Sequence, residues 1–407
     1  MRELLREVLQ QMSGYEAYHQ SRKRARTQTA QGTYEHTVEA VVCDLIHREL
    51  ELAGGSVHVT QSNQVLRKKS RYKGAALGKT LPDILKVMSA EEMDFVEMEK
   101  GERTFTIKED DLSYHVEGKQ TLLRAGPKLL SRIQRFGITF KDIGRSPDEE
   151  VIVLKGPKTR SDRPGSLVEY QDTPETETMR GQLRDINDWI AQVDITCDGS
   201  GIDTTDRRLV RIFNNDDFAQ GGRLYGGFWQ SMKAEHRMDA IIIDDDSIAE
   251  LDYGQVGVLL LYALESKTPP EGDHYDLTAY GIPESCRAGI KKVVQAAINA
   301  DSPLKRMPKG ARKTIPSRIS LSVILSAIQD KHHGIAQRFH AGVGLRLMRK
   351  ESDILIDVLL ALKKEQITAL PIHDAVLVRH DKAQQAREVM VRVFKDHTGL
   401  VPEVSVE

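Results

Sequence analysis

The sequence predicts an α+β protein, in which a mainly helical N-terminal region precedes a region of alternating apolar strands and amphipathic helices. Ser247–Leu251 alternates apolar and polar residues, which is typical of a half-buried strand. Val256–Tyr262 is a dense apolar run that is too continuous for a loop and suits a buried helix. Ile367–Arg379 contains two short apolar runs on either side of His373-Asp374, a pattern typical of a β-hairpin.

Length and composition limit the class of protein. The 407 residues are enough for two or three domains, and 29% of them are charged while only 5% are aromatic. No apolar run approaches the roughly 20 residues that span a bilayer, and no signal peptide is recognisable, so we expect no membrane association and a cytoplasmic location. The three cysteines are widely spaced without a CxxC, which argues against a zinc site or a disulfide framework.

The net charge of −2 argues against a simple basic DNA-coating protein, but a basic groove and an acidic metal site could cancel in this sum. Two N-terminal clusters, Ser21–Arg26 and Arg67–Lys73, are rich in lysine and arginine. Each is either a solvated surface or a contact to a nucleic-acid backbone, because these cations neutralise phosphates whatever the base sequence.

A domain edge is expected at Lys155–Gly165, which is rich in proline, glycine and charge. Residues 1–160 would then form a helical or mixed accessory region, and residues 161–407 a second region. Within the first region, apolar periodicity predicts helices at Arg2–Gln11 and Thr37–Leu52, and a strand is expected at Glu102–Lys108.

The second region opens with Thr173-Pro174, a typical helix start with proline at the first helical position. Gly221–Gln230 then reads G-G-R-L-Y-G-G-F-W-Q. Its glycines permit close backbone approach and Arg223 could meet a phosphate or sugar, whereas the alternative is a plain glycine-rich hairpin. Asp244–Asp246 is either an acidic metal-binding cluster or a hairpin turn, and its place between two strands favours the turn.

Two aspartates are candidate ligands because each follows an apolar strand. Asp252 stands at a strand-to-helix junction, where it is either a helix N-cap or a ligand. Asp374 stands at a hairpin tip, where it is either a turn residue or a ligand. Carboxylates from neighbouring strands are what a two-metal phosphoryl-transfer site requires, since two Mg²⁺ ions roughly 4 Å apart must be held there.

These stretches are also similar to known motifs. L-D-Y-G-Q-V-G-V-L resembles motif A of the DNA polymerase I family. P-I-H-D-A-V-L-V resembles motif C of that family, and equally the I-H-D segment of the single-subunit phage and mitochondrial RNA polymerases. The resemblance implies that Asp252 and Asp374 bind two Mg²⁺ or Mn²⁺ ions, that Tyr253 lies at the nucleotide, and that His373 neighbours the primer end.

A helix between the two aspartates carries polar residues at a spacing of four: Arg287, Lys291, Gln295 and Asn299. This face is either merely exposed or a binding surface. In its position it resembles motif B, the R-x-x-x-K helix of both polymerase groups, which implies that Arg287 and Lys291 hold the incoming triphosphate. The aromatic residue usual at Asn299, and the glycine after it, are absent.

Two further segments are expected to contact nucleic acid. G-R-L-Y-G, with Arg223 and Tyr225, resembles the G-R-x-Y segment that precedes motif A in the single-subunit RNA polymerases. A proline-containing basic stretch would suit a template backbone; its cations are Lys305, Arg306, Lys309, Arg312 and Lys313.

The resemblance covers roughly residues 200–400 in the order A, B, C and implies a right-hand polymerase. Its palm would carry both aspartates, and its fingers would occupy about residues 270–335. Phosphate-binding loops of the G-x-G-x-x-G and P-loop types are absent, which disfavours a nucleotide-hydrolysing motor. A bacterial or phage-type setting is expected.

The expected activity is template-directed nucleotidyl transfer in DNA replication, with a template, a primer and nucleoside triphosphates as partners. Gly257 stands where DNA polymerases of the family carry a glutamate that crowds out a 2′-hydroxyl, so a primase or RNA-polymerase-like enzyme that accepts ribonucleotides is expected. The alternatives are a DNA-dependent DNA polymerase, a degenerate polymerase fold that only binds nucleic acid, and an unrelated metal-dependent nuclease or phosphotransferase.

Overall fold

The computed structural model describes residues 1–22, 24–74, 76–101, 103–107, 114–146, 148–159, 164–199 and 201–407. The chain divides into two compact units. Unit 1 is Met1–Glu150 with Gly199–Asp206, and unit 2 is Val151–Asp198 with Arg207–Glu407. None of the described helices is both long enough and apolar enough to cross a membrane.

The division falls earlier than the predicted domain edge at Lys155–Gly165. This segment lies within unit 2 as a loop folded back on strand β6 (Ile152–Leu154). Lys155 bridges to Leu167, and the amide of Gly156 donates to the carbonyl of Ser166 at 2.8 Å. Residues 160–163 of the segment lie outside the described residues. Its proline and glycine content therefore marks a loop and not a connection between units.

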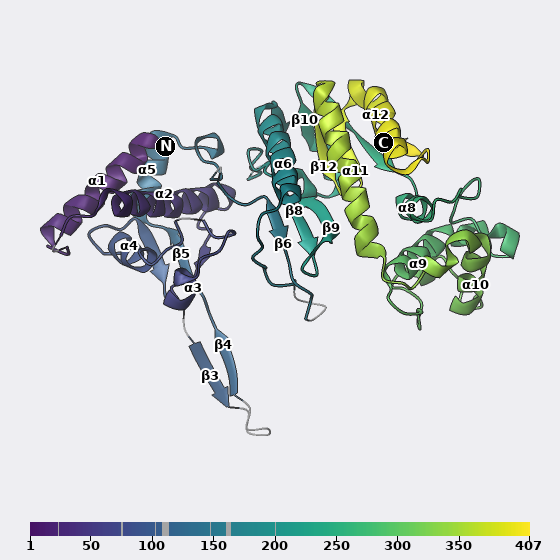
Figure 1. Cartoon of the computed structure of the whole chain (residues 1–407). Coiled ribbons are helices and arrows are strands. Elements are labelled where there is room, and N and C mark those ends of the chain that lie inside the picture. Colours follow the sequence, from purple (N-terminus) through teal and green to yellow (C-terminus); the bar gives the residue numbers. More distant parts are fainter. Residues whose placement is uncertain are drawn as a thin grey trace. The chain divides into compact units, whose positions relative to one another are not determined.

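Unit 1 combines helices with a three-stranded antiparallel sheet of order β1-β5-β2 (Figure 1). Both predicted helices are present, but the second begins at Gln28 because Thr27 caps it, its Oγ1 accepting from the amide of Ala30 at 3.3 Å. The predicted strand Glu102–Lys108 is β3, although Glu102 and Lys108 themselves lie outside the described residues. The elements are α1 (Arg2–Tyr18), α2 (Gln28–Glu51), β1 (Val57–Val59), α3 (Asn63–Arg67), α4 (Leu81–Met88), β2 (Val96–Glu99), β3 (Arg103–Ile107), β4 (Tyr114–Gly118), β5 (Thr121–Ala125) and α5 (Pro127–Phe136).

Unit 2 is built on a six-stranded sheet of order β12-β13-β11-β10-β7, in which β14 also pairs with β11. Every pairing in it is antiparallel. The alternating sequence at Ser247–Leu251 is the middle of β11, with Ile248 and Leu251 buried. Asp244 and Asp245 form the predicted turn before β11, both at positive φ (46° and 64°), which aspartate tolerates better than most residues. The strands are β7 (Ile195–Cys197), β10 (Ile241–Ile243), β11 (Asp246–Tyr253), β12 (Ala369–Ile372), β13 (Ala375–Arg379) and β14 (Val404–Val406).

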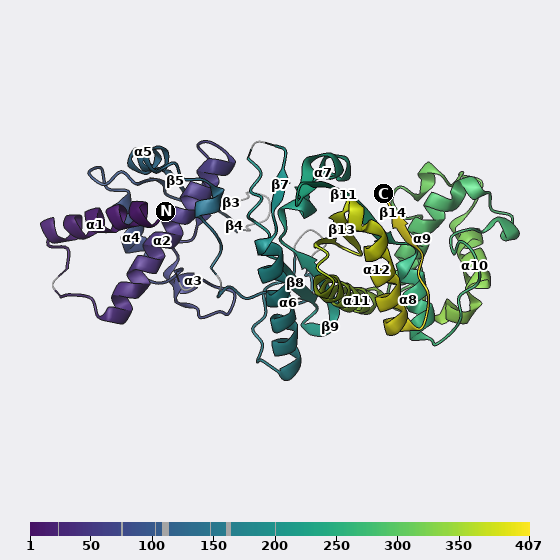
Figure 2. The ribbon, with the colours of Figure 1, turned by 90° about the horizontal axis from the view of Figure 1, so that it is seen from above.

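A second, three-stranded sheet of unit 2 has the order β6-β8-β9, with β6 parallel to β8. Helix α11 packs against β9, α6 and α12, and Figures 1 and 2 show it running beside α6. Helix α6 begins as predicted, since Thr173 caps it and Pro174 is its first residue. The elements are β8 (Val210–Asn214), β9 (Asp217–Tyr225), α6 (Pro174–Gln192), α7 (Ala234–Ala240), α11 (Gly344–Lys364) and α12 (Ala383–Thr398).

Three helices complete unit 2 and follow the central strand in sequence: α8 (Val256–Leu264), α9 (Arg287–Asn299) and α10 (Leu321–Lys331). Helix α8 is the dense apolar run, and six of its nine residues are buried. Helices α9 and α10 lie together at one end of the unit (Figure 2). Gly289 lets α9 approach the segment after it closely, because a Cβ there would meet the carbonyl oxygen of Ala311 at 2.7 Å and Ile315 at 2.6 Å.

We expect Gly289→Ala to lower the free energy of unfolding of unit 2 by about 1–3 kcal/mol, because the added methyl group overlaps main chain. The matched control is Gly181→Ala in the exposed interior of α6, where nothing lies within 4 Å of the added atom. That change should raise the free energy by roughly 0.5–1 kcal/mol through the unfolded state. Both tryptophans, Trp189 and Trp229, belong to unit 2, so urea unfolding followed by fluorescence reports on it. Equal stabilisation by both changes would contradict the α9 packing.

Candidate active site

Asp252 lies near the end of the central strand β11. At this residue, other strands pair with β11 on both of its sides. β13 places Ala375 opposite Asp252, and β14 places Ser405 opposite it. The strand continues past Asp252, and α8 begins only at Val256 with Gln255 as its N-cap residue. The N-cap interpretation of Asp252 is therefore wrong, and its half-buried side chain remains free for another role.

Asp374 lies at the tip of the β12–β13 hairpin. Ile372 pairs with Ala375, so His373 and Asp374 form a two-residue turn. His373 has a φ of 55°, in the left-handed region that non-glycine residues seldom adopt. Because Ala375 also pairs with Asp252, the turn brings Asp374 to the same end of the sheet as Asp252.

The two carboxylates affect one another electrostatically. Burial raises the pKa of Asp252 to about 6, with a further contribution from the negative charge of Asp374. The positive charge of Lys291 on α9 opposes this shift, while Glu250 and Glu407 add to it. A negative charge nearby disfavours ionisation of Asp252. The arrangement is therefore one that a bound cation would stabilise.

A third carboxylate, Glu351 on α11, joins this group and was missed from the sequence. It is 9% exposed, and burial raises its pKa to about 7, with Asp374 and Asp252 also contributing. Arg223 on β9 opposes the shift, since its Nη2 lies 2.7 Å and its Nε 2.8 Å from Glu351 Oε1. Arg223 thus lies at the site as expected from the sequence, but it is already paired with Glu351.

A signal for Glu351 was present in the sequence. It lies four residues after Leu347 and four before Leu355, both buried, so it is an acid on the apolar face of an amphipathic helix. A carboxylate in such a position is costly to bury without a partner. This conflict with the apolar pattern identifies Glu351 as a candidate functional residue.

Helix α9 presents the four predicted polar residues along one face. Arg287, Lys291 and Asn299 are exposed, and Gln295 is half-buried. Arg287 is bound to Asp273 through Nε and Nη2, and this hydrogen bond is the main reason that the pKa of Arg287 is raised. The positive charge of Lys291 acts on Asp252 and lowers the pKa of that carboxylate.

The two predicted aromatic site residues, Tyr253 and Tyr225, differ in burial. Tyr253 is only 4% exposed, and its hydroxyl donates to the carbonyl of Met390 at 2.8 Å. It is a core residue, because alternation along β11 turns it away from the face of Asp252, and we leave it out of the proposed site. Tyr225 is 39% exposed at the end of β9. The residue His373 as a whole is exposed in its turn. The pKa of its imidazole is lowered, chiefly because the protein removes part of the water around the ring.

The basic segments play mixed roles. The five cations from Lys305 to Lys313 are exposed, but Arg312 donates to the carbonyls of Pro316 (2.7 Å) and Ile319 (2.9 Å) and so also stabilises its own loop. In unit 1, Arg26 pairs with Glu16 at 2.5 Å and Lys73 donates to main-chain carbonyls. Lys23 of the first cluster lies outside the described residues.

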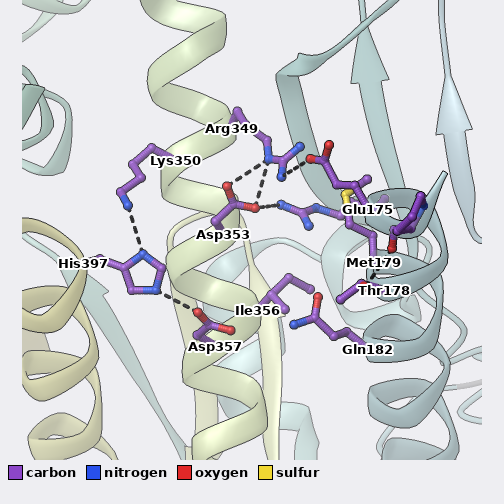
Figure 3. A pocket seen from close by; sticks show the side chains of 12 residues that line it. Glu175, Thr178, Met179, Gln182, Arg349, Lys350, Asp353, Ile356, Asp357 and His397 are labelled. Atoms are coloured by element: carbon purple, nitrogen blue, oxygen red, sulfur yellow. Dashed lines mark hydrogen bonds and ion pairs between the residues drawn. The ribbon is translucent and has the colours of Figure 1, made fainter.

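A separate cavity of about 520 Å³ lies between α6, α11 and α12 of unit 2 (Figure 3). Asp353 accepts from Arg211 at 2.6 Å and from Arg349 at 2.9 Å, while His397 bridges Asp357 (2.8 Å) and Lys350 (3.1 Å). Glu175 on α6 also pairs with Arg349 at 3.3 Å, so the network ties α6, α11, α12 and β8 together. We interpret it as a structural ion-pair network, away from the face that carries Asp252.

The donor set at Asp252 and Asp374 fits Mg²⁺ or Mn²⁺ bound together with a substrate. In the described part of the chain, no cluster of three or more His, Cys, Asp or Glu side chains is suited to hold a metal ion alone. Mg²⁺ is commonly bound by one or two carboxylates plus substrate phosphates, and it prefers oxygen ligands. Two aspartates at one end of the sheet are therefore a suitable partial site.

Comparison with known proteins gives likenesses among solved structures. No family model matches the sequence, and no curated protein sequence matches it. Among solved structures, the chain is similar to the POL domain of Pol1 from M. smegmatis in complex with DNA primer-template and dNTP, at 12% identity and a TM-score of 0.35. The match covers 92% of this chain, which spans only 65% of the length of that chain. The sequence identity and the TM-score are both low, so any functional conclusion must rest on the residues of this chain.

We expect Asp252→Asn to stabilise the protein at pH 8 in the absence of divalent ions. The folded pKa of about 6 lies above the ordinary 3.8, so the aspartate favours the folded state at low pH and loses this contribution as the pH rises through 6. Because the side chain is half-exposed, we expect the gain at pH 8 to be only about 1–2 kcal/mol. Urea unfolding between pH 4 and pH 8 should show the gain shrinking toward low pH. The exposed Asp239→Asn should give a flat difference, and a flat difference for Asp252→Asn would contradict the described electrostatics.

Proposed function

We propose that the chain is a template-directed nucleotidyltransferase that uses two Mg²⁺ or Mn²⁺ ions, held by Asp252 and Asp374. The observation that carries this proposal is the β11–β13 register, which brings the two aspartates to one end of the sheet. The burial of Asp252 and the neighbouring charge of Asp374, which together raise the pKa of Asp252, support it, because a bound cation would stabilise the ionised carboxylate there.

In the proposed reaction, the 3′-hydroxyl of a primer attacks the α-phosphorus of a nucleoside triphosphate, a new phosphodiester bond forms, and pyrophosphate leaves. The ions would lower the pKa of the attacking hydroxyl and stabilise charge on the leaving group. Lys291 and Arg287 would neutralise the triphosphate, and Arg287 would exchange Asp273 for phosphate oxygens. Arg223, oriented by Glu351, would lie against the nucleic acid.

In this proposal, the six-stranded sheet is the palm and residues 270–335, which include α9 and α10, are the fingers. The region from residue 161 onward would carry the polymerase site, with residues 1–160 as an accessory region. The exposed cations from Lys305 to Lys313 would contact the template backbone, apart from Arg312, whose guanidinium already binds main chain. His373, at the hairpin tip beside Asp374, would lie near the primer end.

Ribonucleotide use is the finer part of the proposal, as in primer synthesis during DNA replication. Gly257 lies one residue into α8 and has no side chain to oppose a 2′-hydroxyl. A family A type DNA polymerase is the alternative if ribonucleotides are rejected. A degenerate fold that only binds nucleic acid is favoured by one observation, the engagement of Arg287 by Asp273.

We expect Asp252→Asn and Asp374→Asn each to reduce nucleotide incorporation by about 10³-fold or more, because each removes a carboxylate that would hold the ions. Primer extension with each nucleotide class, with and without Mg²⁺, measures this. Asp245→Asn, in the turn of the neighbouring hairpin at a φ of 64°, is the control and should keep full activity. Folded aspartate variants with unchanged incorporation would refute the two-ion assignment, and an unmodified protein without incorporation would favour the binding-only alternative.

We expect Gly257→Glu to shift the preference toward deoxynucleotides by about tenfold, since its side chain would occupy space near the sugar. A Cβ at Gly257 would lie 3.4 Å from Gln295 Nε2 and 3.6 Å from Ile298, so only a small adjustment of Gln295 is needed. Gly257→Ala should leave the preference close to that of the unmodified protein. The readout is the ratio of kcat/KM for ATP and dATP. Rejection of ATP by the unmodified protein would leave a DNA polymerase as the answer.

A further inference from the structure

Residues 226–230, the second half of the glycine-rich segment, have no part in the proposed reaction, yet their contacts lead to the hairpin that carries Asp374. The side chain of Trp229 is fully buried, and its Nε1 donates to the carbonyl of Pro371 at 2.9 Å. The half-buried Gln230 donates to the same carbonyl through Nε2 at 3.0 Å. Pro371 lies on β12, three residues before Asp374. One main-chain oxygen close to the candidate site therefore accepts from two side chains of this segment.

The carbonyl of Pro371 is available because of its place in the hairpin. β12 is the outermost of the described strands at its side of the six-stranded sheet. The residues that flank the two-residue turn, Ile372 and Ala375, form a hydrogen-bonded pair, so Pro371 before them belongs to a pair of the other kind and turns its carbonyl outward. All four residues of β12 are buried, and a buried carbonyl requires a partner. Trp229 and Gln230 thus take the place of a further strand at this point.

Gln230 also holds the end of β9, the strand that carries Arg223. Its Nε2 donates to the carbonyl of Leu224 at 3.2 Å, and its Oε1 accepts from the amide of Gly226 at 3.0 Å. A single side-chain amide therefore links the end of β9, in the three-stranded sheet, to the outer strand of the six-stranded sheet.

Arg237 on α7 fixes the same segment to the central strand β11. Its side chain is buried and donates through Nη1 to the carbonyl of Met232 at 3.2 Å and through Nη2 to Glu250 Oε2 at 2.9 Å. Glu250 precedes Asp252 by two residues on β11. The chain from Trp229 to Arg237 is therefore attached both to the strand of Asp252 and to the hairpin of Asp374.

The turn that carries Asp374 needs support from its surroundings. His373 occupies the first position of the turn at a φ of 55°, where two-residue hairpin turns favour glycine or asparagine. Such a conformation persists only where the surrounding structure determines it. The pairing of Ile372 with Ala375 determines the turn from within the hairpin, and the two donors to Pro371 determine it from outside.

We infer that Gln230 and Trp229 are positioning residues of the candidate site, which fix the turn that presents Asp374 to a metal ion by holding the carbonyl of Pro371. This inference rests on the proposed function, because the position of Asp374 affects activity only if its carboxylate binds an ion. Groups behind a metal ligand set its orientation, and their removal weakens metal binding although they do not touch the ion.

The experiment is primer extension by the full chain over a range of Mg²⁺ concentrations, in Trp229→Phe, Gln230→Met and the double variant. Each single change leaves the carbonyl of Pro371 one donor, so we expect the half-saturating Mg²⁺ concentration to rise by about threefold. The double change leaves it none, and the rise should be about 10- to 100-fold, more than the product of the single effects. At saturating Mg²⁺, kcat should return to within about twofold of the unmodified value, because the reacting groups are intact.

The matched control is Tyr262→Phe, which removes a buried hydroxyl that lies 3.0 Å from His332 Nδ1, a contact that involves neither β9 nor the β12–β13 hairpin. It should lower the resistance of unit 2 to urea but leave the half-saturating Mg²⁺ concentration unchanged. An unchanged value in the folded double variant, or an equal rise in Tyr262→Phe, would overturn the inference and leave the proposed function intact. If the double variant does not fold, an unchanged value in both single variants overturns it.

Hydrogen exchange followed by mass spectrometry separates this inference from the proposed function, because it requires no activity. In the double variant, the amides of residues 372–375 should exchange about tenfold faster or more, while those of β10 and β11 keep their protection. If the unmodified chain forms no product with any nucleotide, the proposed function fails, and faster exchange confined to the hairpin still supports the positioning role. Unchanged exchange in the hairpin overturns it.

Discussion

The antiparallel pairing of β11 with β13 is the constraint on which the candidate site depends. Main-chain hydrogen bonds fix Ala375 opposite Asp252, and the two-residue turn next to Ala375 then fixes Asp374. A slip of one residue would turn Asp252 to the other face of the sheet and exchange it with core residues such as Leu251. Strand pairing thus holds together two carboxylates that their own charges would separate, and β14 reinforces it from the other side.

Helix α11 connects this constraint to the rest of unit 2. One face carries Glu351 toward Arg223 and the two aspartates, and another carries Arg349 and Asp353 toward β8 and α6. Buried ion pairs add little stability by themselves, but removing one partner is costly because a lone charge stays behind. The two networks therefore fix the rotation of the helix more than they strengthen its packing. That rotation decides how near Glu351 lies to Asp374.

The sequence predicts well those features that depend on local pattern. The strand at Ser247–Leu251, the His373-Asp374 hairpin and the capped start of α6 all occur where apolar alternation or turn chemistry placed them. Helix starts inside polar sequence were less accurate: α2 begins at Gln28, where the cap on Thr27 outweighs a weak apolar period. The polar face of α9 also occurs as predicted, because it needs only the helical repeat.

Features that depend on contacts between distant segments were not predictable in the same way. The ion pair between Arg223 and Glu351 joins residues 128 positions apart, and neither partner is recognisable without the other. Asp252 was ambiguous between a cap and a ligand, because sequence pattern cannot locate the end of a strand to within two residues. Tyr275 gave no signal, since a tyrosine in a loop carries no periodicity and its burial is a property of the folded state.

Helix α9 ends in a polar residue, Asn299, and this bears on how a nucleotide would be bound there. Asn299 is the residue at which the resemblance to motif B led us to expect an aromatic side chain, and its Nδ2 donates to the carbonyl of Gln295 within its own helix at 2.8 Å. That side chain is therefore committed to the helix end and offers no ring surface to a nucleotide. A buried aromatic ring, that of Tyr275, instead lies against Arg287 on the polar face of α9. If α9 binds the triphosphate as proposed, the aromatic ring that lies against its polar face comes from the segment before α9 and not from the helix itself.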